Sequence, residues 1–162
     1  MNPTPTSPHA LSALIRRVTA PRAAAIWEAP RVLLEQAALT TGLTRRGWFA
    51  ARVDRAPVFD KPTLLHALYQ AGCFPGYFGF NWDALNDVLT DLSWLRAQER
   101  PAEGAAFILA HSAVLAERSP DDYATLLDII REAAAARQTA ARPPLVLLVE
   151  QRVEAAVQTA ED

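Results

Sequence analysis

Three short and almost wholly apolar runs constrain the fold of this 162-residue chain most strongly. They extend from Trp48 to Val53, from Ala105 to Ala110 and from Leu145 to Val149. Each run has the length of a strand, and the segments between them carry the spacing of apolar residues that is typical of amphipathic helices. Parallel strands are joined through helices and need cover on both faces, so the pattern predicts an α/β fold with a three-stranded parallel sheet covered by helices.

Residues that favour helix N-termini mark where the intervening helices begin. Asp60 is expected to cap one helix, and Asn81 is expected to cap a second helix that runs to about Leu92. Ser119 precedes the longest expected helix, which ends near Arg137. From the first apolar run onward, the predicted order is therefore strand, helix, helix, strand, helix, strand.

The chain before the first apolar run is less regular. Asn2 to Pro8 is rich in proline and threonine, a composition that predicts disorder. Short helices are expected from about His9 to Val18 and from Arg31 to Thr40, and Gly42 is expected to end the second. The segment is thus predicted to be partly disordered and partly helical.

These patterns divide the chain into three parts. Residues 1–45 are expected to form an N-terminal arm, residues 46–150 the α/β domain, and residues 151–162 a C-terminal tail. All three predicted strands lie outside the arm. Deletion of residues 1–44 is therefore expected to leave a folded domain that still binds its partner.

The formal net charge of −2 conceals a strong asymmetry along the chain. Residues 1–58 carry eight arginines and three acidic residues, which gives +5, whereas residues 59–162 carry eight basic and fifteen acidic residues, which gives −7. An acidic main domain attracts a basic partner and repels nucleic acid. Acidity that only keeps the protein soluble is the alternative. The arginines at positions 45, 46, 52 and 55 form a cluster too short, and too unlike any known motif, to predict direct nucleic-acid binding.

Several classes of protein are disfavoured by what the sequence lacks. Cys73 is the only cysteine, so the chain has no internal disulfide and no cysteine cluster for zinc, which fits a cytoplasmic protein. Met1 to Ala20 lacks the apolar core of a secretory signal, and no apolar run is long enough to cross a membrane. His66 and His111 belong to no pair with ligand spacing, so no metal or cofactor is expected.

The expected helix from Asn81 to Leu92 has two contrasting sides. At 100° per residue, Asp83, Asp87 and Asp91 form a stripe on one of them. The opposite, apolar side carries Trp82, Leu85, Val88, Leu89 and Leu92. Carboxylates one helical turn apart destabilise a helix by about 0.2–0.5 kcal/mol per pair, and the sequence supplies no Lys or Arg between Tyr77 and Leu95. The stripe is therefore expected to serve something other than helix stability.

Three interpretations of this stripe are open from the residues alone. It is a solvated acidic face, a surface that binds cations, or a pair of catalytic carboxylates such as Asp83 and Asp87 in a small hydrolase. The catalytic interpretation also needs a cleft and substrate-positioning groups, which the sequence does not reveal. Binding to a cationic partner is the favoured interpretation.

The run from Tyr77 to Thr90 resembles the signature of the barstar family of intracellular ribonuclease inhibitors. In that signature, an aromatic-glycine loop leads into a helix that reads Asn, apolar, Asp-Ala-Leu, any residue, Asp, any residue, Leu-Thr. The similarity is ungapped over this run, and a weaker similarity in element order covers residues 47 to 150. The resemblance implies a barstar-like fold and an inhibitor that has no catalytic residues and needs no cofactor.

The resemblance also implies how the protein binds. In this family the loop and the helix plug the active site of a basic ribonuclease, with carboxylates in the place of RNA phosphates. Asp87 corresponds to the central anchor, and Glu132 corresponds to a further acidic contact on the long helix. The contact residues that follow from the resemblance are Tyr77, Gly79, Asp83, Asn86, Asp87 and Glu132. A carboxylate gripped by several arginines makes charge-assisted hydrogen bonds, which agrees with this role.

Three positions depart from the better-known member of the family. Asn86 and Leu92 stand where that protein has tryptophans, and Ala136 stands in the place of a second acidic residue beyond Glu132. The partner implied is therefore a basic, barnase-like ribonuclease or a related basic toxin. A scaffold for a partner that is not a nuclease is the remaining alternative.

The aromatic residues near the signature have different expected roles. Trp27, Trp48 and Trp94 are expected to fill the core or an interface, and Trp82 is expected to lie in the core. The resemblance implies that Tyr77 is exposed, whereas the next residue in the loop packs inward.

Overall fold

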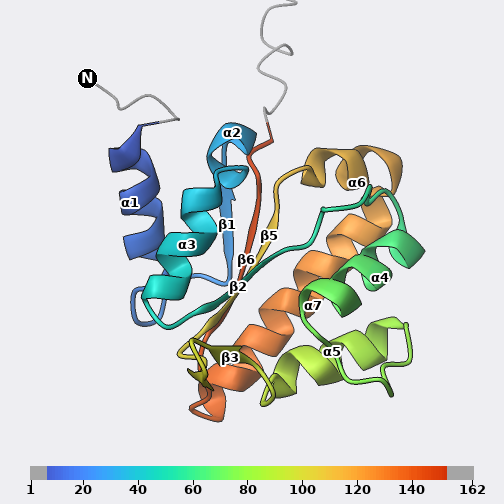
Figure 1. The fold of residues 1–162 in the computed structure, drawn as a ribbon. Helices are drawn as coiled ribbons and strands as arrows, with labels where there is room; N and C mark the ends of the chain where they lie inside the picture. Colours follow the sequence, from blue (N-terminus) through green and yellow to red (C-terminus); the bar gives the residue numbers. More distant parts are fainter. Residues whose placement is uncertain (1–6, 153–162) are drawn as a thin grey trace, which may run out of the picture.

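The computed structural model describes residues 7–152 of the chain. At its centre lies a parallel sheet of four strands, β1 (Ile26–Ala29), β2 (Phe49–Arg52), β5 (Ala105–Leu109) and β6 (Leu145–Glu150). Their order across the sheet is β1-β6-β5-β2 (Figure 1). The predicted α/β class is confirmed, and the predicted count of three strands is wrong by one.

The extra strand, β1, comes from the predicted arm. It pairs in parallel with β6, with Ile26 opposite Leu147 and Ala29 opposite Glu150. Only four residues long, and interrupted by a glutamate, β1 does not stand out as an apolar run in the sequence. Its place in the sheet depends on β6, which lies more than a hundred positions further along the chain.

The burial of the two central strands, β5 and β6, explains why both stood out in the sequence as apolar runs. Every residue of β5 and β6 is buried, because helices cover the sheet on both faces. The outer strand β2 is only half-buried along its length. The three predicted apolar runs thus correspond to β2, β5 and β6.

Two separate helical layers cover the sheet, one on each face (Figure 1). The N-terminal layer contains α1 (Pro8–Val18), α2 (Arg31–Leu34) and α3 (Ala37–Arg45). The second layer contains α4 (Lys61–Ala71), α5 (Trp82–Asp91), α6 (Ser112–Arg118) and α7 (Pro120–Thr139). A short hairpin of β3 (Arg96–Ala97) and β4 (Arg100–Pro101) follows α5.

Alternate residues of β5 divide between the two hydrophobic cores. Phe107 and Leu109 pack into the core beneath α4, α5 and α7, whereas Ala106 and Ile108 pack into the core beneath the N-terminal layer. This alternation is the ordinary consequence of strand geometry. It means that the sheet has two apolar faces, and each one needs its own cover.

The predicted caps of the second layer are largely confirmed. The Asp60 side chain accepts a hydrogen bond from the Thr63 N–H in a capping box at the start of α4. Asn81 caps α5, and α7 begins at Pro120 as expected. Ser119 does not cap α7 with its side chain, because its hydroxyl donates to the Phe59 carbonyl instead.

The predictions for the arm are only partly confirmed. The first helix, α1, matches its prediction, but the expected helix from Arg31 to Thr40 is in fact two helices, α2 and α3. Gly42 lies inside α3 and does not end it, and a Cβ atom at Gly42 would collide with Ile15 Cδ1 of α1. The glycine therefore permits close approach of two helices, where the sequence had suggested a stop signal.

The division at residue 45 stays a prediction, although β1 joins the arm to the sheet. Most of the expected disordered segment, residues 2–6, lies outside the described residues. The C-terminal tail also lies outside them beyond Arg152. None of the helices in the described part is long and apolar enough to cross a membrane.

Candidate partner-binding face

The aromatic-glycine loop between α4 and α5 holds two adjacent aromatic residues, Tyr77 and Phe78, in opposite environments. The Tyr77 side chain is 78% exposed, whereas Phe78 is 4% exposed. The Phe78 ring packs edge-on against Phe74, with the ring centroids 5.1 Å apart. The buried ring anchors the loop and leaves Tyr77 free to contact a partner, as the resemblance implied.

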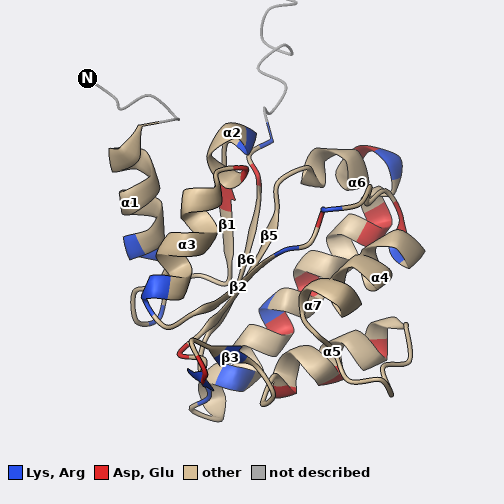
Figure 2. Ribbon diagram, viewed as in Figure 1, with Lys and Arg blue, Asp and Glu red and all other residues tan. Residues whose placement is uncertain are grey.

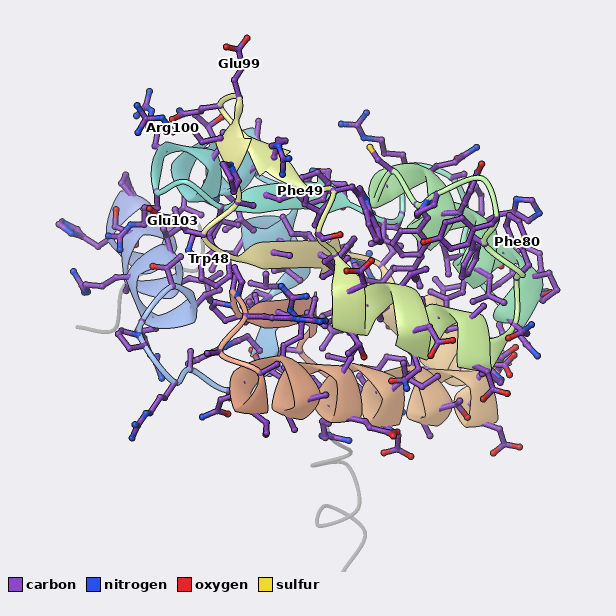
Figure 3. All side chains as sticks on the ribbon, turned by 90° about the horizontal axis from the view of Figure 1, so that it is seen from below. Trp48, Phe49, Phe80, Glu99, Arg100 and Glu103 are labelled. Carbon is purple, nitrogen blue, oxygen red and sulfur yellow. The ribbon has the colours of Figure 1, made fainter. Side chains whose placement is uncertain are left out.

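Phe80 is a candidate contact residue that the sequence reasoning missed. It has a left-handed backbone, with φ of 51°, and is 38% exposed. Its ring packs against Tyr69 and His66 of α4, at centroid distances of 5.1 and 4.7 Å. Figure 3 shows Phe80 at the end of the molecule where this loop leads into α5. Its place between two residues of the signature was the signal available in the sequence.

Gly79 and Asn81 connect the loop to the start of α5. Asn81 Oδ1 accepts a hydrogen bond from the Ala84 N–H at 2.8 Å, and Asn81 Nδ2 donates to the Gly79 carbonyl at 3.3 Å. A Cβ atom at Gly79 would lie 3.3 Å from the same Nδ2 atom. A larger residue would therefore press on the side chain that caps the helix.

The two sides of α5 follow the predicted pattern. Leu85, Val88 and Leu89 are buried beneath the helix, and Asp83 and Asp87 are exposed. The prediction for Trp82 needs correction, because this ring is only partly buried at the edge of the core. Lys61 Nζ lies 5.2 Å from the Trp82 ring centroid, so the exposed part of the ring is covered by a cation.

Within the described part of the chain, the carboxylates of this face have no ion-pair partner. The ion pairs among the described residues are Arg31–Glu150 and Arg131–Asp128, and His111 Nε2 also contacts Glu35 at 2.9 Å. None of them includes Asp83, Asp87 or Glu132, which is exposed on α7. α7 packs directly along α5, and Figure 2 shows acidic residues on both helices.

The cations nearest to α5 act at its C-terminal end. Arg137 of α7 is buried, and its Nη1 atom donates to the carbonyls of Thr90 and Asp91 at 3.0 and 2.8 Å. Its Nε atom donates to the Pro143 carbonyl at 2.8 Å, and Arg142 also donates to Thr90. These contacts satisfy carbonyls that have no partner within the helix and place positive charge at the negative end of its dipole.

The environment of Arg137 distinguishes Asp91 from Asp87. Burial lowers the pKa of Arg137 first, the charge of Arg142 lowers it further, and the charge of Asp91 opposes them. Asp91 therefore lies close enough to Arg137 to be partly compensated, and it is half-buried. Asp87 is exposed, and neither of these contacts reaches it. No ion pair of the described residues includes Asp83 or Asp87, whereas Asp91 lies near Arg137, a cation from a distant part of the sequence.

Asn86 lies next to Asp87 but is turned further inward. The residue is half-buried, and its Oδ1 atom is fully buried without a hydrogen-bond partner among the described residues. An unpartnered buried acceptor is unfavourable, so this amide has an unmet hydrogen-bonding capacity at the candidate face. Its predicted role as a contact residue stays a prediction.

None of the three cavities described is lined by Asp83 or Asp87. Within residues 7–152, no three His, Cys, Asp or Glu side chains gather as metal ligands would. A convex acidic helix suits contact with another macromolecule better than it suits enclosure of a small substrate.

Fold and face together define a helix-covered parallel α/β domain that presents an acidic helix and an aromatic loop at one surface. A family model described as Barstar (barnase inhibitor) matches residues 48–149 of the chain. The protein belongs to the barstar family. Comparison with curated proteins finds no match to the chain.

Proposed function

We propose that the protein binds a basic ribonuclease of the barnase type and blocks its active site with α5 and the preceding loop. The observation that carries this proposal is the pair of exposed carboxylates, Asp83 and Asp87, which have no ion-pair partner within residues 7–152 and lie on a helix whose other side is core. Membership of the family of barnase inhibitors supports the choice of partner.

The physical argument begins with the energetic cost of this surface. Asp83 and Asp87 lie one helical turn apart and repel each other, and their repulsion is unrelieved in the free protein. A partner that surrounds them with arginine and lysine side chains removes the repulsion and adds charge-assisted, often bidentate hydrogen bonds. The active site of a ribonuclease carries such cations because it must bind RNA phosphates.

The remaining contact residues surround this pair. Tyr77 supplies an exposed aromatic ring, Gly79 lets a partner approach the loop backbone, and Glu132 extends the acidic surface onto α7. Such complementarity predicts fast, salt-sensitive association, and it fits an immunity-type role in which the inhibitor protects the cell from a toxic nuclease.

The proposal is tested by capture followed by titration. Immobilised wild-type protein and an Asp87→Ala variant are used to recover partners from the source cell, with Asp128→Ala as a control that removes an equal charge from α7. The wild type and the control should retain a basic protein that the Asp87→Ala bait loses. Its hydrolysis of RNA should fall linearly with added inhibitor and cease at a one-to-one ratio.

Two results would overturn this proposal. Hydrolysis of a substrate by the purified protein alone, abolished in Asp87→Ala, would establish the hydrolase alternative. Recovery of a partner without nuclease activity, by a contact that depends on Asp87, would establish a scaffold.

A further inference from the structure

Strand β2 forms an open edge of the sheet. One side of β2 pairs with β5, where the Phe49 N–H donates to the Gly104 carbonyl at 2.9 Å and the Val53 N–H donates to the Ile108 carbonyl at 2.8 Å. Donors alternate along a parallel strand, so the backbone groups of Ala50 and Arg52 point to the other side. No described residue pairs with that side, which therefore offers an unpaired strand edge.

This edge lies at the base of a cavity between the two helical layers. The cavity has a volume of about 700 Å³ and is lined by all four residues of β2. Its walls come from α3, through Ala37, Thr40 and Thr41, and from α4, through Ala67, Gln70 and Ala71. In Figures 1 and 3, β2 lies between α3 and α4 in both views. We call this space, with the edge of β2 as its floor, the β2 slot.

The slot has the shape that an added strand requires. Alanines on both walls allow a second backbone to approach β2, and the unpaired N–H and C=O groups provide its hydrogen-bond partners. The polar side chains on the walls, Thr40, Thr41 and Gln70, keep the slot compatible with solvent when it is empty.

The charge of the slot is positive. Arg52 and Arg55 line it, and no Asp or Glu is among its described lining residues. The Arg52 Nη2 atom is buried and has no hydrogen-bond partner among the described residues. A buried guanidinium nitrogen without an acceptor is unfavourable, and a carboxylate is the acceptor that matches it best.

We propose that the β2 slot binds an extended acidic segment of another protein, which adds a strand to the edge of β2 and places a carboxylate against Arg52. The positive charge of the slot favours this occupant over a second copy of the chain. Pairing of two β2 edges would bring Arg52 and Arg55 of one copy close to the same residues of the other. Like charges on adjacent strands are destabilising, whereas an acidic segment neutralises them.

The proposal is independent of the ribonuclease-binding face. None of the described slot residues lies on α5 or α7, and none lies between Tyr77 and Asn81; Cys73 lines the slot from the start of the same α4–α5 connection. A ribonuclease bound to α5 would not need the slot. Failure of one proposal therefore leaves the other intact.

The test uses the full-length protein and a capped peptide in which glutamate and valine alternate. Titration is followed by NMR and by hydrogen exchange of individual backbone amides. The amides of Ala50 and Arg52 should become protected as the slot fills. Those of Phe49 and Val53, which already bond to β5, should change little. A peptide with lysine in place of glutamate should bind at least about tenfold more weakly, because it loses the charge-assisted contact.

Two further controls separate strand addition from simple charge attraction. The same glutamate peptide with an N-methyl group on every residue should not protect Ala50 or Arg52, because the methyl groups keep both of its edges from pairing with β2. Arg52→Gln should weaken binding of the unmodified peptide about tenfold through loss of the charge. Arg16→Gln, which removes an exposed arginine of α1 outside the slot, should leave binding unchanged.

Three outcomes would overturn the proposal. The first is no protection of Ala50 and Arg52 at any peptide concentration that stays in solution. The second is equal binding of the glutamate and lysine peptides, or of the methylated peptide. The third is protection without peptide that increases with protein concentration, which would show that a second copy occupies the edge.

Discussion

The two helical layers cover opposite faces of the same sheet, but they differ in how their charged side chains are arranged. In the N-terminal layer, Arg31 of α2 contacts Glu150 at the end of β6 at 2.8 Å and Glu35 lies 2.9 Å from His111, while Arg16 and Arg17 of α1 are exposed. In the second layer, α5 buries its apolar side and leaves Asp83 and Asp87 unpaired at the surface. Both layers thus complete the sheet, but the first presents exposed arginines, whereas α5 of the second presents exposed aspartates.

This difference indicates where stability and binding are located. Unpaired carboxylates one turn apart do not help a helix, so their removal should cost little stability. The buried leucines of the N-terminal layer have no role at the surface. Their replacement should therefore lower the free energy of unfolding directly. The predictions below use substitutions to separate these two effects.

The largest effect is expected from deletion of residues 1–44, which reverses the expectation drawn from the sequence. The deletion removes β1 and the buried residues Leu34, Leu39 and Leu43, and it uncovers Ile108 and Leu148 on the sheet. Each fully buried leucine contributes about 2–5 kcal/mol, so the loss reaches the whole stability of an ordinary domain, about 5–15 kcal/mol.

Urea unfolding followed by circular dichroism and tryptophan fluorescence measures this effect. The truncated chain should show no cooperative transition. Leu39→Ala in the full chain provides a graded version, with an expected loss of about 2–5 kcal/mol. A truncated chain that unfolds cooperatively at the same urea concentration as the full protein would show that the N-terminal layer is a separate arm.

A smaller effect is expected from Arg137→Met, which tests whether the second layer also depends on a buried charge. The substitution keeps an apolar stem but leaves the carbonyls of Asp91 and Pro143 without their donor. A fully buried acceptor without a donor costs about 1–3 kcal/mol, and because these two carbonyls are only part-buried a total loss of about 1–2 kcal/mol is expected. Arg131→Met removes an exposed arginine of the same helix and should change stability by less than about 1 kcal/mol. Equal unfolding midpoints for the two variants would refute the role of Arg137 as a support for α5.

The smallest effect is expected from Asp60→Asn at the start of α4. Hydrogen bonds from Thr63, first from its side chain and then from its backbone, lower the pKa of Asp60 below the usual value of 3.8. A carboxyl with a lowered pKa stabilises the fold above its unfolded pKa, and this contribution disappears as the pH falls through the folded pKa. Asparagine still caps the helix but does not titrate there.

Thermal unfolding between neutral pH and pH values below 3.8 checks this expectation. Asp60→Asn should be slightly less stable than the wild type at neutral pH, and the difference should vanish in acid. Asp121→Asn, in the first turn of α7, serves as the matched exposed control. A difference that persists at the lowest pH would mean that the Asp60 charge is not the cause.

The sequence predicted what depends on local pattern. The central strands were recognisable because β5 and β6 are apolar at every position, and α5 because of Asn81 and its two contrasting sides. Strand β1 was not predictable because its four residues carry no pattern of their own and need β6 as a template. The same holds for Gly42, whose role depends on contact with Ile15 of another helix.

The candidate site shows the same division. Exposure of Asp83 and Asp87 follows from helix periodicity, and the contact role of Tyr77 came from the family resemblance. The partial compensation of the Asp91 charge by Arg137 could not be predicted, because Arg137 belongs to a helix more than forty positions away in the sequence. Phe80 is part of the signature, but its exposure could not be predicted because it depends on how the aromatic rings of the loop stack.

The central claim is that α5 fills a cationic pocket of a ribonuclease, and the comparison of Asp87→Ala with Asp91→Ala tests it most directly. Both changes remove one charge from the same helix and relieve repulsion along it, so both proteins should stay folded. The measurement is the dissociation rate of each variant from the captured ribonuclease at several salt concentrations. Asp87→Ala should weaken binding by about 2–5 kcal/mol at every salt concentration, because it leaves buried cations of the partner unpaired. Asp91→Ala should have a much smaller effect, since Asp91 is half-buried beside Arg137. Equal losses that disappear at high salt would contradict the claim and indicate only a diffuse acidic surface.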